Sequence, residues 1–258
     1  MKIYGVVGHP VSQSLSPVIH NAAFEHLEID AEYRAFDVRP GDIGAFVKIL
    51  AREGIWGLSV TMPHKEGIMP FLDEIDDIAR EIGAVNTVYL ENNKYIGTNY
   101  DWIGIKEPLG DVKGKKILIL GAGGAAQAAC YALKDSKVMI WNRTYEKARE
   151  LAGKWDFEAL KDQKQAEIII NCTSVGFDNP GKSPADPKIF RGAEVAYDIV
   201  YGPEETKFLR DAKEAGVPKI ISGEQMLLHQ GYAAFEKWTG EKAPREVMRK
   251  SFHLVLGT

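Results

Sequence analysis

The residues best suited to a defined chemistry lie in a glycine-rich segment, Gly121-Ala122-Gly123-Gly124-Ala125-Ala126. The segment follows the apolar run Ile117–Leu120 and precedes a helical pattern, which is the setting that a dinucleotide-binding G-x-G-x-x-A fingerprint requires. There Gly121 allows a tight turn, Gly123 lets the backbone approach a pyrophosphate, and Ala126 permits close helix packing. The helix start offers unpaired N–H groups to phosphates. We expect a dinucleotide site, rather than an ordinary tight turn.

The end of the next predicted strand distinguishes NAD from NADP. A site for NAD presents an acid there to the ribose 2′-hydroxyl. Here the strand runs into Asn142-Arg143-Thr144, and the nearest acid, Glu146, lies beyond the tip. Arg143 can pair with a 2′-phosphate, Thr144 can donate its hydroxyl, and Lys147 adds positive charge. The sequence favours NADP; the alternatives are a solvated loop arginine and a threonine that only caps a helix.

Hydroxyl side chains gather before the first predicted helix. Ser12, Ser14 and Ser16 alternate with other residues, and Pro17 then opens the helix. Hydroxyl donors beside the N–H groups of a helix start suit a carboxylate. The alternative for Ser16 is a plain N-cap with Pro17 at the first helical position, which needs no ligand.

These motifs fall in an alternation of predicted strands and helices that is typical of an α/β protein. Near-continuous apolar runs such as Ile117–Leu120 and Ile168–Ile170 indicate parallel strands buried on both faces. A second strand–helix series begins near Val112, so we expect two α/β domains, residues 1–101 with 240–258 and residues 102–239. In this division the last helix crosses back to the first domain.

The expected elements follow from periodicity and from turn residues such as Asn92-Asn93. The expected strands are Lys2–Val7, Glu32–Val38, Ile55–Thr61, Val85–Leu90, Lys94–Thr98, Lys115–Leu120, Lys137–Trp141, Glu167–Cys172, Val195–Tyr201 and Lys219–Ser222. The expected helices begin at Ser16 and at Trp102 and otherwise cover Pro40–Arg52, Asp73–Ile82, Gly123–Leu133, Thr144–Lys154, Glu204–Ala215, Gln225–Trp238 and Pro244–Leu256.

Composition narrows the class of protein. The 258 residues are 45% hydrophobic and 26% charged, with 32 basic and 36 acidic side chains, and this mildly acidic balance argues against a nucleic-acid-binding or membrane-binding protein. Cys130 and Cys172 lie in apolar stretches, which indicates reduced core thiols, and neither they nor the histidines have metal-ligand spacing. No signal peptide and no apolar run of ~20 residues is visible. We expect a soluble, cytoplasmic monomer or homodimer that acts on a small molecule without a metal.

Longer motifs resemble the shikimate dehydrogenase family over essentially the whole chain. Residues 12–21 match S-x-S-x-S-P-x-x-H-N, and residues 57–65 are similar to G-x-N-V-T-x-P-x-K. Residues 83–87 and 97–101 match G-A-x-N-T and G-x-N-T-D segments, with Tyr100 in place of a threonine. Further segments that fit are Asn142–Thr144, Asn171–Ser174, Tyr197–Tyr201 and Met226–Gln230.

The resemblance implies an enzyme that interconverts 3-dehydroshikimate and shikimate with NADP(H), in chorismate and aromatic amino-acid biosynthesis. It implies a mainly parallel-sheet N-terminal substrate domain, a C-terminal Rossmann-type NADP domain, and an active site in the cleft between them. Its catalytic pair is Lys65 and Asp101. The substrate-binding residues it implies are Ser14, Ser16, Thr61, Asn86, Asp101, Tyr201 and Gln230. The cofactor-binding residues it implies are Gly121, Ala122, Gly123, Gly124, Ala125, Asn142, Arg143, Thr144, Tyr145, Glu146, Lys147, Ile199 and Gly223.

The implied pair makes chemical sense. Hydride transfer at a carbonyl carbon changes the charge on its oxygen, so an adjacent group must exchange a proton with that oxygen. Lys65 can do so, and Asp101 can hold the ammonium in register. Without the resemblance, Lys65 is a surface lysine and Asp101 a helix N-cap.

This sequence departs from the family pattern at Ser59, where asparagine is usual, and at Ser222, where aspartate is common. Two other functions stay open: a quinate/shikimate dehydrogenase of broader specificity, and a non-catalytic NADP(H)-binding sensor.

Overall fold

The computed structural model describes residues 1–202 and 205–257, and the chain divides into two compact units. The first unit comprises Met1–Tyr100 together with the segment from Leu228 to the C-terminus, and the second unit comprises Asp101–Leu227. Each unit contains a six-stranded sheet.

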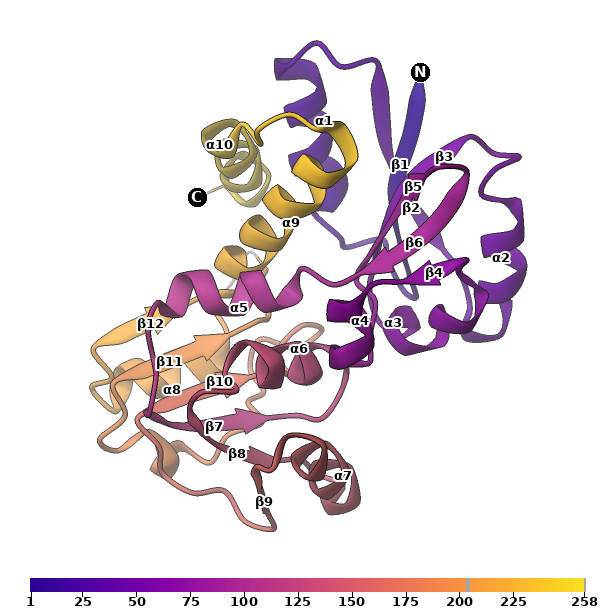
Figure 1. Ribbon diagram of the computed structural model, residues 1–258. Coiled ribbons are helices and arrows are strands. Elements are labelled where there is room, and N and C mark those ends of the chain that lie inside the picture. The colour runs from indigo at the N-terminus through magenta and orange to yellow at the C-terminus, as the bar shows by residue number, and fades with distance from the viewer. Residues whose placement is uncertain (203–204, 258) are drawn as a thin grey trace. The chain divides into compact units, whose positions relative to one another are not determined.

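The sheet of the first unit is mixed, with the strand order β2-β1-β3-β5-β6-β4 (Figure 1). Strand β1 pairs in parallel with β2 and β3, and β4 pairs in parallel with β6, whereas β3–β5 and β5–β6 are antiparallel. The strands are β1 (Lys2–Gly8), β2 (Ala31–Asp37), β3 (Ile55–Val60), β4 (Glu74–Ile75), β5 (Thr87–Glu91) and β6 (Lys94–Thr98).

Helices cover this sheet because alternate strand residues are apolar on both faces. One face carries a core that includes Val7, Leu58 and Val60 and packs against α2 and α4. The other carries an aromatic cluster in which Tyr4 contacts Phe24 and Trp238, from α1 and α9. The helices are α1 (Ser16–His26), η1 (Pro40–Asp42), α2 (Ile43–Ile49), α3 (His64–Gly67), η2 (Met69–Phe71), α4 (Asp77–Ile82), α9 (Gly223–Thr239, whose first residues belong to the second unit) and α10 (Arg245–Leu256).

The sheet of the second unit is entirely parallel, with the order β12-β11-β10-β7-β8-β9 (Figure 1). Counted within the unit this is the order 6-5-4-1-2-3, which is that of dinucleotide-binding folds. The strands are β7 (Lys116–Leu120), β8 (Lys137–Trp141), β9 (Glu158–Leu160), β10 (Ile168–Asn171), β11 (Val195–Asp198) and β12 (Lys219–Ile221).

Both faces of this second sheet are buried, as the apolar runs predicted. In β7, Ile117 and Ile119 pack into a core with α5, α6 and α7, whereas Leu118 and Leu120 pack into a core with η3 and α8. Cys130 and Cys172 lie in the first of these cores as free, buried thiols. The helices are α5 (Asp101–Leu109), α6 (Gly124–Ala132), α7 (Tyr145–Trp155), η3 (Pro187–Phe190) and α8 (Lys207–Glu214).

Several predicted boundaries were wrong. The expected helix Asp73–Ile82 is the short strand β4 followed by α4, because the Asp76 carboxylate accepts a hydrogen bond from the Ala79 N–H (2.7 Å) and starts the helix there. Strand β11 ends at Asp198 rather than Tyr201. The expected helix start at Glu204 lies outside the described residues, and α8 begins at Lys207.

Within the described residues, no helix combines the length and the apolar character that crossing a membrane requires. Over the same residues, no group of three or more His, Cys, Asp or Glu side chains is arranged to hold a metal ion.

Candidate functional site

The glycine-rich turn after β7 has room for a ligand on one side. Gly121 has φ +120°, and a Cβ there would lie 3.0 Å from the Cys172 carbonyl oxygen, so both conformation and space require glycine. A Cβ on Gly123 would meet no heavy atom of the described residues within 4 Å. Gly123 is the N-cap residue of α6, so this space adjoins a helix start whose N–H groups suit a pyrophosphate.

The tip of β8 supports a site for a 2′-phosphate. Arg143, Thr144 and Lys147 are exposed, and no ion pair of Arg143 occurs among the described residues. Thr144 occupies the N-cap position of α7, but its hydroxyl does not cap the helix. Asn142 shapes the turn, since its Nδ2 donates to the Thr144 carbonyl (2.9 Å). The hydroxyl of Thr144 is therefore not engaged in capping.

A further cation beside the tip of β8, Lys161, was not predicted from the sequence. Strand β9 runs parallel to β8, with Leu160 opposite Trp141, so Lys161 follows its strand at the same edge. Lys161 Nζ lies 5.5 Å from the ring centre of Tyr145. A cavity of about 450 Å³ adjoins it, lined in part by Trp141 and Lys161. The three-residue strand β9 carries too little pattern for this neighbour to be predicted.

A buried carboxylate joins the ends of β10 and β11. Asp198 Oδ1 accepts hydrogen bonds from Asn171 Nδ2 (2.8 Å) and from the Val200 N–H (3.0 Å), and Oδ2 accepts one from the Thr206 hydroxyl (2.6 Å). Burial raises the pKa of Asp198 to about 6, and the three donated hydrogen bonds act against this rise. At neutral pH the carboxylate is therefore charged and fully hydrogen-bonded.

This raised pKa predicts a pH-dependent contribution to stability. The folded pKa of Asp198 is about 6 against 3.8 for the free side chain, so the folded state holds the proton more tightly. The contribution is fully present below the unfolded pKa and is lost as the pH rises through 6. We expect the difference in unfolding free energy between wild type and Asp198→Asn to fall by about 2–3 kcal/mol from near pH 4 to near pH 7. Urea unfolding at both pH values measures it, and a difference that is constant or grows with pH would contradict the assignment.

The segment after β11 is held closely against the start of α9. A Cβ on Gly223 would lie 2.4 Å from the carbonyl oxygens of both Ile199 and Val200, so only glycine fits there. The ring of Tyr201 packs edge-on against Phe177, with 6.1 Å between centroids. Ile199, Tyr201 and Gly223, all predicted from the resemblance, thus lie in one part of the second unit. Ser222 directly precedes this close approach.

In the first unit, backbone hydrogen bonds gather three predicted residues at the end of β3. The Thr61 N–H donates to the Val7 carbonyl, and the His64 N–H donates to the Thr61 carbonyl (both 2.9 Å). Lys65 follows in α3, and its carbonyl accepts from the Val85 N–H (2.8 Å). Val85 directly precedes Asn86.

Asn86 lies near the end of β3, where its backbone and side chain hydrogen-bond to several other residues. Its N–H donates to the Thr98 carbonyl (3.0 Å), and its Oδ1 accepts from the Tyr100 N–H (2.7 Å) and the Thr87 hydroxyl (2.9 Å). Its Nδ2 donates to Gln230 Oε1 (3.3 Å) in α9. Asn86 and Gln230 are 2% and 6% exposed. The structure thus brings Asn86 to Gln230, 144 positions away in the chain.

The serine segment adopts a turn that excludes the simple capping alternative for Ser16. Helix α1 begins at Ser16, and the N-cap position belongs to Leu15. Ser14 Oγ accepts a hydrogen bond from the Ser16 N–H (3.3 Å), and Ser16 is 4% exposed. Asp101 likewise is the first residue of α5 rather than the residue before it, and it is 3% exposed.

The residues that follow in the serine motif hold β2, an edge strand. Asn21 Nδ2 donates to the Tyr33 carbonyl (2.9 Å), and the Tyr33 N–H donates to Asn21 Oδ1 (2.7 Å). The His20 ring stacks on Tyr33 at 4.5 Å, and burial lowers the pKa of His20 to about 3, so the ring is neutral. The Tyr33 hydroxyl donates to Ser59 Oγ (2.7 Å), which gives the departure at Ser59 a defined partner.

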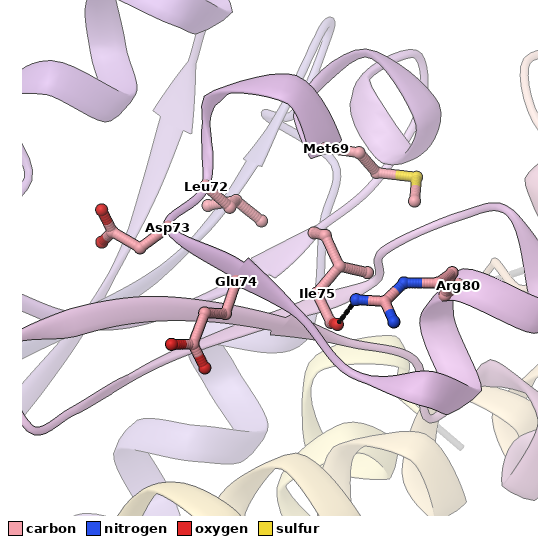
Figure 2. Close-up of a pocket in the computed structure, with 6 residues that line it drawn as sticks. All are labelled: Met69, Leu72, Asp73, Glu74, Ile75 and Arg80. Carbon is pink, nitrogen blue, oxygen red and sulfur yellow. Dashed lines mark hydrogen bonds between the residues drawn. The ribbon is translucent and has the colours of Figure 1, made fainter.

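The predicted residues divide between the units. The first unit holds Ser14, Ser16, Thr61, Lys65, Asn86 and Gln230, and the second holds Asp101, Tyr201 and every predicted cofactor residue. None of them lines the cavity of about 400 Å³ in Figure 2, whose walls are Met69, Leu72, Asp73, Glu74, Ile75 and Arg80. There Arg80 donates to the Ile75 carbonyl (2.7 Å).

Comparisons with known proteins show which family the chain resembles. Residues 6–88 match a model of the shikimate dehydrogenase substrate binding domain, residues 105–176 one of shikimate / quinate 5-dehydrogenase, and residues 223–251 one of the shikimate 5′-dehydrogenase C-terminal domain. The NADP(+) shikimate dehydrogenase of Aquifex aeolicus is 42% identical, covering 99% of this chain and 98% of its own. That of Moorella thermoacetica is 41% identical, covering 99% and 94%.

A crystal structure of the enzyme from Thermus thermophilus in complex with NADP(H) and shikimate is also similar. It superposes with a TM-score of 0.90 at 36% identity, covering 97% of this chain and 98% of that chain. The chain belongs to the shikimate dehydrogenase family.

Proposed function

We propose that this protein is an NADP-dependent oxidoreductase that reversibly reduces 3-dehydroshikimate to shikimate, in chorismate and aromatic amino-acid biosynthesis. The observation that carries the proposal is the group of polar residues near the end of β3 in the first unit. There Thr61, Lys65, Asn86 and Gln230 come from separate parts of the chain. Asn86 donates directly to Gln230, and the carbonyls of Thr61 and Lys65 accept hydrogen bonds from His64 and from Val85, the residue before Asn86. A family relative at 36% identity is described in complex with NADP(H) and shikimate.

The second unit fits a phosphorylated dinucleotide. The open side of Gly123, the start of α6 and the exposed Arg143 and Lys147 supply space, N–H donors and positive charge. NADP(H), when bound, supplies or accepts the hydride. We assign Gly121–Ala125, Asn142–Lys147, Ile199 and Gly223 to holding it.

We assign the proton transfer to Lys65 of the first unit. Lys65 donates a proton to the carbonyl oxygen as charge develops on it during reduction, and takes it back in the reverse direction. Asp101 holds the Lys65 ammonium and the neighbouring hydroxyl of the substrate. Ser14, Ser16 and Tyr201 bind the carboxylate of shikimate, and Thr61, Asn86 and Gln230 bind its ring hydroxyls.

The proposal extends to the setting of the enzyme. We assign substrate binding to the first unit and NADP(H) binding to the second. The domain boundaries, residues 1–101 with 240–258 for one domain and residues 102–239 for the other, stay a prediction. A cytoplasmic monomer or homodimer with no nucleic-acid or membrane partner completes the proposal.

A spectrophotometric assay tests the function. Shikimate should reduce NADP+ to NADPH at a rate that rises with enzyme concentration. Quinate in place of shikimate, and NAD+ in place of NADP+, should be used much more slowly. Equal rates with quinate would favour the broader enzyme, and NADPH binding without any turnover would favour the sensor.

The serine turn predicts a loss of substrate binding that grows with each hydroxyl removed. If Ser14 and Ser16 donate to one carboxylate at the start of α1, the double Ser→Ala variant should raise KM for shikimate more than either single change. We expect a rise of about 10–100-fold for each lost hydroxyl, since hydrogen bonds to charged groups contribute ~1.5–3 kcal/mol. Urea unfolding serves as the control. A double variant that loses only stability would show that the hydroxyls merely hold the turn.

A further inference from the structure

The Asp198 carboxylate ties together three segments that are separate in the chain. It is fully buried, and its three donors come from the end of β10 (Asn171), from the segment after β11 (Val200) and from the start of α8 (Thr206). Asn171 is held in turn, since its Oδ1 accepts from the Thr173 N–H (2.9 Å) and hydroxyl (2.7 Å). The carboxylate is thus the common point of two strand ends and a helix start.

The segment that this carboxylate fixes contains two residues of the proposed function. Ile199 and Tyr201 flank Val200, whose N–H donates to Asp198, and the Ile199 N–H donates to the Asn171 carbonyl (3.1 Å). On the other side, Gly223 leaves no space for a Cβ beside the Ile199 and Val200 carbonyls. A shift of this backbone would move Ile199 and Tyr201 together.

We propose that Asp198, braced by Thr206 and Asn171, is a positioning residue that sets the placement of Ile199 and Tyr201. The inference rests on the proposed function, because that function gives the two residues their ligands. Asp198 itself acts only through the backbone that it holds.

The donor pattern explains why a carboxylate stands at this position. All three neighbours present N–H or O–H groups to it, and an ionised carboxylate only accepts hydrogen bonds. An asparagine would turn its NH₂ group toward one of these donors, and of the three only the Thr206 hydroxyl could accept a hydrogen bond from it. Thr206 is the most informative partner to change, because its hydroxyl can be removed while the charge stays.

The experiment compares Thr206→Val with Thr206→Ser. Valine keeps the shape and removes the hydroxyl, whereas serine keeps the hydrogen bond to Asp198 and the cap on the Leu209 N–H. Thr206→Val removes a hydrogen bond to the charged group that holds the backbone of Ile199 and Tyr201 in place. We therefore expect KM for shikimate and the Kd of NADPH to rise by about tenfold, with a much smaller fall in kcat. Thr206→Ser should stay near wild type.

A matched control separates positioning from general destabilisation. Asp76 caps α4 in the first unit through a bond to the Ala79 N–H (2.7 Å), so Asp76→Ala also removes one helix cap. It should lower the urea midpoint and leave both KM and the NADPH Kd unchanged. If it raises them as much as Thr206→Val does, positioning is overturned.

A double-variant cycle with Tyr201→Phe tests the route of the effect. If Asp198 acts through Tyr201, Thr206→Val should add little to the rise in KM that Tyr201→Phe causes alone, because coupled changes are not additive. Fully additive rises would overturn this route. A wild-type protein without turnover would overturn the proposed function instead, and the NADPH Kd of Thr206→Val against Thr206→Ser would still decide the positioning role.

Discussion

Lys65→Ala is expected to lower kcat by about 10²–10⁴, the usual contribution of general acid–base catalysis. This corresponds to ~2.7–5.4 kcal/mol of lost transition-state stabilisation. KM for shikimate should change much less, because Ser14, Ser16 and Asn86 still bind the substrate. Steady-state kinetics in both directions measure the two constants separately.

The control and the partner variant sharpen this test. Lys48→Ala removes an exposed lysine of α2 in the same unit and should leave kcat unchanged. Asp101→Asn keeps the shape of a buried side chain and removes its charge, so it should also lower kcat. The double variant should be little worse than Lys65→Ala, since catalytic residues that act as a unit are not additive. Wild-type turnover in Lys65→Ala would overturn the mechanism.

Arg143→Ala is expected to raise KM for NADP+ by about 10–100-fold, since charge-assisted hydrogen bonds contribute ~1.5–3 kcal/mol. KM for NAD+ should stay nearly unchanged, because NAD+ lacks the 2′-phosphate that Arg143 would bind. Arg143 is exposed at the tip of β8, so its removal leaves no cavity in the core. The two constants are measured with shikimate held at saturation.

Another exposed arginine provides the comparison for this cofactor test. Arg52 lies in the first unit and pairs with Glu53 at 3.0 Å. Arg52→Ala changes the net charge by the same amount and should affect neither cofactor. Equal losses with NADP+ and NAD+ in Arg143→Ala would remove the assignment of Arg143 to the 2′-phosphate.

The parts of the fold that the sequence predicts well are those with strong local signals. The apolar runs of β7 and β10 predicted parallel strands buried on both faces, and the sheet order confirms it. Asn92 and Asn93 predicted a hairpin turn, and both have the positive φ (51° and 61°) that such a turn needs. In contrast, β4 and β9 were missed, because strands of two or three residues carry no period.

The candidate site shows the same limit. The motifs named Asn86, Gln230, Asn171 and Asp198, but no local pattern says that Asn86 reaches Gln230 or that Asp198 faces Thr206. Those contacts depend on strand register, for example Asn171 opposite Asp198 in β10 and β11. They also depend on where a helix begins, as Thr206 shows at the start of α8.

The pairing of Asn21 with Tyr33 has a consequence for solubility. Strand β2 ends the sheet of the first unit, so the backbone groups on its outer side would otherwise invite a strand from another molecule. The amide of Asn21 occupies the N–H and the carbonyl of Tyr33 at the middle of that strand. A single side chain therefore occupies two backbone groups that a neighbouring strand would otherwise bond, which disfavours edge-to-edge pairing with another molecule at this point.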